Sequence, residues 1–163
     1  MLITLARRAA VLALVAVAAA PVAHAQTANQ TVTFAVNAIN QISFTGAPSL
    51  TITTAVAGSA PTSVTDATAA WAVTTNQTGA KITASIAAIM PTGLTLSANL
   101  ATPAGGTSAG YLALGTTAVD VVTGITKLAQ ASLAVTYKLD ATAAAGVVAS
   151  ATRVVTYTIT GGV

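Results

Sequence analysis

Apolar and polar residues alternate along most of the chain with a period of two, which predicts β-strands rather than helices. The first such segment runs from Gln30 to Phe44 and predicts one long or kinked strand. Five apolar residues share one face of this segment: Val32, Phe34, Val36, Ile42 and Phe44. We expect this face to contact an apolar interior, either that of its own domain or that of a neighbouring copy.

Similar alternation recurs along the rest of the chain between turn-forming sequences such as Asn76–Gly79. It predicts further strands at 50–53, 71–74, 82–86, 94–100, 111–114, 118–122, 132–139 and 153–160. We expect Asp140–Gly146 to close a hairpin between the last two, with a helical turn competing within 141–151. The pattern predicts an all-β domain, an antiparallel β-sandwich of immunoglobulin-like or jelly-roll type with seven to nine strands and Trp71 in its core.

The first 25 residues have the order of features of a secretory signal. Arg7 and Arg8 precede the apolar stretch Ala9–Ala20, and Ala23 and Ala25 supply the small residues before a cleavage site. The apolar helix expected there has twelve residues, whereas a membrane span needs about 20. We therefore expect cleavage before Gln26 and a single exported domain over 26–163, located in the periplasm, at the cell surface or outside the cell.

Charge is scarce in the expected mature domain. Two of the six basic residues fall in the leader, so residues 26–163 carry four basic and three acidic side chains, and 28 of these 138 residues are Thr. The basic residues are scattered and form no patch for nucleic acid. Because strand edges are usually protected from pairing by charged residues, a domain with so few is suited to pairing with another copy.

Most catalytic chemistry is excluded by residue content. The chain has no Cys and no Glu, and its single His, His24, lies in the leader. A Ser-His-Asp triad, a thiol nucleophile or a His- or Cys-based zinc site therefore cannot form in the mature domain. The three carboxylates, Asp66, Asp120 and Asp140, lie beside turn signals, where Asp favours local hydrogen bonds. We expect no enzyme activity, no cofactor and no metal site.

An export signal, an alternating N-terminal segment, Ala/Thr-rich strands and the closing strand V-V-T-Y-T-I-T occur together in this chain. In this combination it resembles the immunoglobulin-like pilin or fibre subunits of bacteria. The resemblance implies a structural surface protein in which an extended segment of one copy completes the sheet of the next. The chain departs from that family in having no disulfide, and its Tyr157 lies six residues from the end rather than next to last.

Other interpretations of the sequence stay open. Residues 30–44 pair either within their own domain or with another copy of the chain. The first alternative function is a monomeric secreted β-sandwich that binds a ligand through its loops. The second is a small outer-membrane β-barrel, although the chain has few of the aromatic residues that line the interfaces of such barrels.

Overall fold

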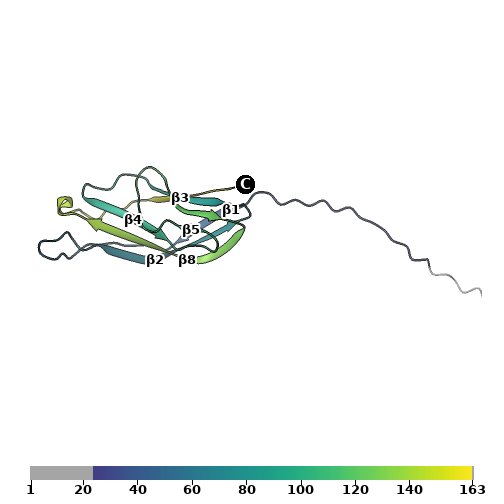
Figure 1. The fold of residues 1–163 in the computed structure, drawn as a ribbon, viewed down its shortest axis with the longest axis horizontal. Coiled ribbons are helices and arrows are strands. Elements are labelled where there is room, and N and C mark those ends of the chain that lie inside the picture. The colour runs from purple at the N-terminus through teal and green to yellow at the C-terminus, as the bar shows by residue number, and fades with distance from the viewer. Residues whose placement is uncertain (1–23, 163) are drawn as a thin grey trace, which may run out of the picture. The chain divides into compact units, whose positions relative to one another are not determined.

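The computed structural model describes residues 24–162, which form an all-β structure without an α-helix in that range (Figure 1). Nine strands are present within these residues, and they form two antiparallel sheets. The predicted all-β class is thus confirmed. Of the predicted leader, only His24 and Ala25 fall within the described residues. No helix among the described residues has the length and hydrophobicity needed to cross a membrane.

One sheet has five strands and the other has four. The five-stranded sheet has the order β1 (Asn40–Thr45), β2 (Val64–Thr75), β8 (Leu128–Ala141), β4 (Leu94–Leu100) and β6 (Leu112–Ala113). The four-stranded sheet has the order β5 (Thr107–Ser108), β7 (Val119–Ile125), β3 (Ala80–Ile86) and β9 (Val155–Thr160). β1 and β9 are therefore edge strands, each hydrogen-bonded on one side only, to β2 and β3 respectively.

Both sheets contribute to one hydrophobic core. Its largest fully buried side chains are Trp71, Ile82, Leu100 and Ile125, with several valines between them. Trp71 is 1% exposed, which confirms its predicted place in the core. In β3, Ile82, Ala84 and Ile86 are buried while the alternate residues are partly exposed, as the period of two predicted.

The predicted first strand is too long. The strand begins at Asn40, whereas residues 24–39 belong to no strand. The reason lies in its partner: Asn40 is opposite Thr75, the last residue of β2, and the turn at residues 76–79 follows at once. No length of β2 is left for the residues before Asn40 to pair with.

Two further predictions are corrected by the structure. The hairpin through Asp140–Gly146 is wrong, because β8 is flanked by β2 and β4 and the chain instead crosses to the other sheet, where β9 pairs with β3. The helical turn considered within 141–151 is present as the short 3-10 helix Ala143–Ala145. Residues 50–53 form no strand. The regular pairing of β1 with β2 ends at Thr45, before Gly46, and the following Pro48 has no N–H to donate to a ladder.

Candidate strand-addition site

The N-terminal part of the predicted addition segment is exposed. Val32, Phe34 and Val36 are 72%, 89% and 78% exposed, respectively. Within the part of the chain that the structure describes, residues 26–36 make no backbone–backbone hydrogen bond. The segment therefore has three large apolar side chains and a strand-forming sequence, but no sheet to pair with.

The Asn76 side chain fixes the point at which this segment leaves the domain. Its Oδ1 accepts a hydrogen bond from the Ile39 N–H at 2.8 Å, and its Nδ2 donates to the Asn37 carbonyl, also at 2.8 Å. Next to it, the Thr75 hydroxyl donates to Asn40 Oδ1 at 2.7 Å. We call this contact of Asn76 with residues 37–39 the Asn76 clamp. It holds the chain to the domain from Asn37 onward.

The other two residues of the predicted segment already belong to their own sheet. Ile42 and Phe44 lie in β1, are half-buried, and pack against the core. The Phe44 ring lies between Trp71, with ring centroids 6.3 Å apart, and Tyr157, with centroids 3.9 Å apart. The structure thus divides the predicted set of five residues into an exposed group of three and an intramolecular group of two.

The edge strands β1 and β9 carry no charge. The β1 sequence is NQISFT and the β9 sequence is VTYTIT, and neither contains a charged residue or a proline. These are the residues with which proteins usually block the pairing of exposed edges. Both edges are therefore chemically open to a further strand.

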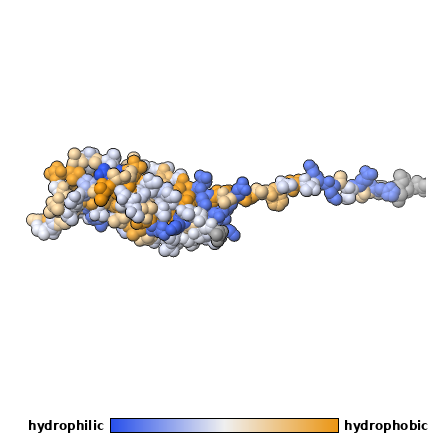
Figure 2. Space-filling model, turned by 90° about the horizontal axis from the view of Figure 1, so that it is seen from above, coloured by the Kyte–Doolittle hydropathy of each residue, from blue (hydrophilic) through white to orange (hydrophobic). Residues whose placement is uncertain are grey.

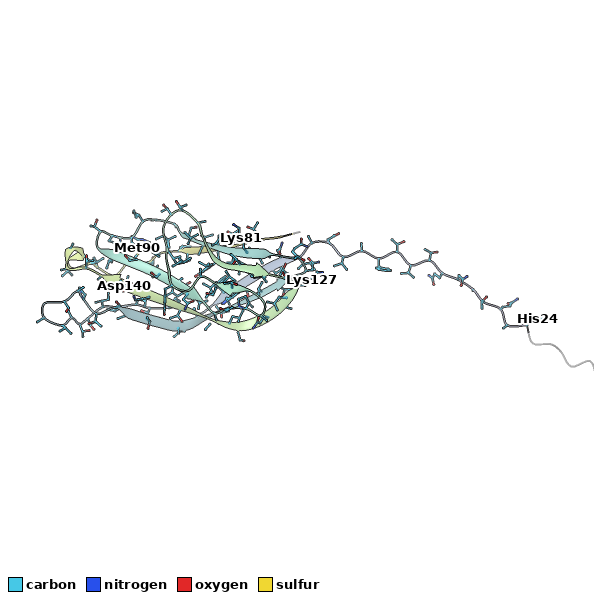
Figure 3. The ribbon with its side chains drawn as sticks, in the orientation of Figure 1. His24, Lys81, Met90, Lys127 and Asp140 are labelled. Carbon is cyan, nitrogen blue, oxygen red and sulfur yellow. The ribbon has the colours of Figure 1, made fainter. Side chains whose placement is uncertain are left out.

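A groove of about 560 Å³ with a mixed polar and apolar lining is formed in part by residues that follow β1 and residues that precede β9. Its lining includes the apolar residues Leu50, Ile52, Met90, Leu94, Leu139 and Val148. The apolar colouring at the loop end of the domain is visible in Figure 2. Figure 3 labels Met90 near this end and Lys127 at the opposite end of the domain. Because the Lys127 N–H bonds to the Gln77 carbonyl, the Asn76 clamp also lies at that opposite end.

Two segments that line the groove, 50–53 and 148–151, have unpaired backbones. Among the described residues, neither makes a backbone–backbone hydrogen bond. Their N–H and C=O groups are thus available to a strand placed beside them. The groove therefore combines apolar side chains with unused backbone hydrogen-bonding groups, which are the two requirements for accepting a strand.

Arg153 is the one charged residue of the groove lining. Its Nε and Nη2 donate to the Ile89 carbonyl at 3.3 and 3.1 Å, and its Nη1 donates to the Thr152 carbonyl at 2.8 Å. With these bonds the guanidinium ties the segment before β9 to the loop after β3.

The sequence analysis did not predict the groove. The one signal in the sequence is the alternation at 50–53, which predicts a strand that the structure does not contain.

The three carboxylates lie in strands, not in the predicted turns, and they do not converge. Asp120 pairs with Lys81 at 3.0 Å, and Asp140 pairs with Lys138 at 2.9 Å and accepts a hydrogen bond from Ser63. The Ser63 hydroxyl and then Lys138 hold the pKa of Asp140 below its usual value. No cluster of three His, Cys, Asp or Glu side chains occurs within residues 24–162.

Comparison with protein-family models, with curated proteins and with solved structures found no match for this chain. We therefore infer its function from its own geometry and chemistry.

Proposed function

We propose that the chain is an exported, non-catalytic structural protein of a bacterial cell surface, whose copies assemble into a fibre by strand addition. The observation that carries this proposal is the exposure of Val32, Phe34 and Val36 on a segment with no partner. The proposed architecture is a β-sandwich of immunoglobulin-like or jelly-roll type. Two antiparallel sheets around one core support it.

The energetics favour a buried state for the segment. Burying an apolar side chain of this size contributes roughly 1.5–3 kcal/mol, so three of them would offset much of the entropy lost on ordering a short strand. Strand addition also supplies main-chain hydrogen bonds along the acceptor. Both contributions are available only in a complex, because the segment buries none of these three side chains in the single copy.

Residue content supports a non-catalytic role. Residues 26–163 contain no His, Cys or Glu, and the three Asp side chains are engaged with Lys81, Lys138 or local hydroxyl and backbone groups. Export rests on the sequence features of residues 1–25, which include the basic pair, the apolar stretch and the small residues.

The size distribution of the natively exported protein tests the proposal. We expect a ladder of multimers or filaments in the wild type and mainly monomers for Phe34→Ser. The matched control is Thr33→Ser, which makes the same new residue one position earlier on the opposite face of the segment and should assemble normally. A wild-type protein that is monomeric at all concentrations would contradict the proposal.

The groove supports a second candidate function, a monomeric secreted domain that binds an apolar ligand through its loops. Its volume and mixed polar and apolar lining are within the range of small-molecule sites. A monomer that carries an apolar compound after purification, detected by native mass spectrometry, would favour this candidate over assembly.

A further inference from the structure

We propose that the groove at the loop end accepts residues 30–36 of a second copy of this chain, so that copies join head to tail. This inference rests on the proposed function and identifies the acceptor surface that strand addition requires. The donor residues are Val32, Phe34 and Val36, and the acceptor consists of the apolar residues of the lining together with the backbones of residues 50–53 and 148–151.

The groove matches the segment in chemistry. The segment 30–36 has no charged residue, and Arg153, the single charge of the groove lining, already bonds to the Ile89 and Thr152 carbonyls. The alternation of the segment would place three apolar side chains toward Leu94 and Leu139, and its threonines toward solvent. Its backbone would pair with the unpaired groups of the two lining segments 50–53 and 148–151.

A chain cannot fill its own groove with these residues. Asn40 lies opposite Thr75, and the Ser49 N–H bonds to Asp66 on the same strand β2. At the rise of a strand, nine residues of β2 place the start of the groove roughly 30 Å from the Asn76 clamp. Phe34 is three residues from Asn37 and reaches at most about 10 Å from it. The occupant must therefore come from another copy.

The edges of β1 and β9 are weaker acceptors for the same segment. The sheets are already joined between these strands by the stacked rings of Phe44 and Tyr157. A strand added to either edge would gain backbone hydrogen bonds, but its apolar face would find no open interior for Phe34. At the groove, both kinds of contact are available together.

The geometry also specifies the type of assembly. The donor leaves the domain at one end and the acceptor lies at the other, as the positions of Lys127 and Met90 indicate (Figure 3). Donor and acceptor are different surfaces, so the contact is heterologous and is repeated from copy to copy. Contacts of this type build open filaments unless the rotation between copies closes a ring.

Disulfide trapping between two full-length variants tests the acceptor, and the absence of native Cys makes it specific. Thr33→Cys chains are mixed under oxidising conditions with chains carrying Ser150→Cys or Thr51→Cys, both exposed positions of the groove lining. The comparison acceptors are Thr158→Cys on β9 and Thr107→Cys on β5. We expect the mixed disulfide at a groove position and little at the comparison positions.

A blocking variant gives the second readout. Ala149→Trp fills the groove from an exposed position, and Ala118→Trp is the matched exposed control outside it. The new indole would occupy the space of one large apolar side chain of the donor segment. Ala149→Trp should therefore weaken association about ten- to a hundredfold. Ala118→Trp should assemble as the wild type does.

The outcomes separate this inference from the proposed function. Normal assembly of Ala149→Trp, or trapping only at Thr158→Cys or Thr107→Cys, would overturn the groove as acceptor and leave strand addition in place. A wild type that never assembles would overturn both. A copurified apolar molecule that Ala149→Trp expels and Phe34→Ser leaves in place would assign the groove to a small ligand instead.

Discussion

The hydroxyl groups of Tyr137 and Tyr157 lie 2.9 Å apart and form a hydrogen bond between the two sheets. Tyr137 is a buried residue of β8 in the five-stranded sheet, and Tyr157 is a half-buried residue of the edge strand β9. The same Tyr157 ring stacks on Phe44 of β1. Tyr157 thus links β9 to the five-stranded sheet through one polar contact with β8 and one aromatic contact with β1.

We predict strong coupling between the two tyrosines. Tyr137→Phe or Tyr157→Phe alone leaves a partly buried hydroxyl without its partner and should lower the free energy of unfolding by about 1–2 kcal/mol. The double variant removes both hydroxyls and should cost clearly less than the sum of the single changes. Denaturant titration of all four proteins measures the coupling. Strictly additive losses would show that the hydrogen bond adds nothing to stability.

The same pair predicts alkaline sensitivity. Burial raises the pKa of both Tyr157 and Tyr137. The folded state therefore holds these protons more tightly than the unfolded state, whose tyrosines ionise near pH 10. Stability from this source is complete below about pH 10 and is lost as the pH rises further. Unfolding midpoints measured across this range should fall in the wild type and fall less steeply in the double Phe variant.

Individual strands could be predicted from the sequence where alternation and turn residues agree. Ile82, Ala84 and Ile86 are buried as expected, and the turn at residues 76–79 was identified correctly. Alternation reports which face of a strand is apolar, but it does not report whether a partner strand is within reach. Residues 32–36 and 42–44 have the same pattern, and only the second group lies opposite β2.

Pairing over long distances could not be predicted from local signals. The turn sequence after Asp140 suggested a hairpin, but both edges of β8 are occupied by strands distant in the sequence. The groove was missed for the same reason, because its lining comes from three separate loop regions. The sequence predicts Val32, Phe34 and Val36 as part of a strand-addition segment, and the structure adds that these side chains are exposed.

We predict that Gly46 is required directly after β1, where its backbone lies close to β2. A Cβ at this position would lie 2.7 Å from the Thr68 carbonyl oxygen and 2.8 Å from Ala69 Cα, and the φ angle is +96°. Backbone atoms of β2 cannot move aside without disturbing the sheet, so Gly46→Ala should destabilise the domain by about 2–4 kcal/mol. Gly105→Ala, with φ +71° and open space around it, is the control and should cost only about 1–2 kcal/mol. Equal losses of stability in the two variants would show that the backbone moves and relieves the clash at position 46.

The hydrogen bonds to the Asp66 carboxylate predict that the domain loses stability in acid. Hydrogen bonds from the Thr68 hydroxyl, and then from the backbone N–H groups of Ser49 and Thr68, lower the pKa of this carboxyl. Because the folded value lies below the unfolded value of about 3.9, the stabilisation is present above that pH and is lost as the pH falls through the folded value. Asp66→Asn should flatten the acid limb of the stability profile in denaturant titrations. An unchanged limb would assign acid unfolding to other groups.

The last prediction compares the two phenylalanines, which occupy opposite environments in the same predicted strand. Phe44 stacks on Tyr157 and Trp71, whereas Phe34 is 89% exposed. In monomeric samples, Phe44→Ala should lower the free energy of unfolding by about 2–3 kcal/mol, and Phe34→Ala should change it by less than about 0.5 kcal/mol.

The reverse order is expected for assembly. Phe34→Ala, and more strongly Phe34→Asp, should reduce multimer formation at full subunit stability, because the proposed strand addition buries this side chain only in the acceptor. Thermal unfolding and light scattering on the same samples measure the two effects separately. A large loss of monomer stability in Phe34→Asp would contradict this assignment, because it would mean that the segment from Gln30 onward packs within its own domain.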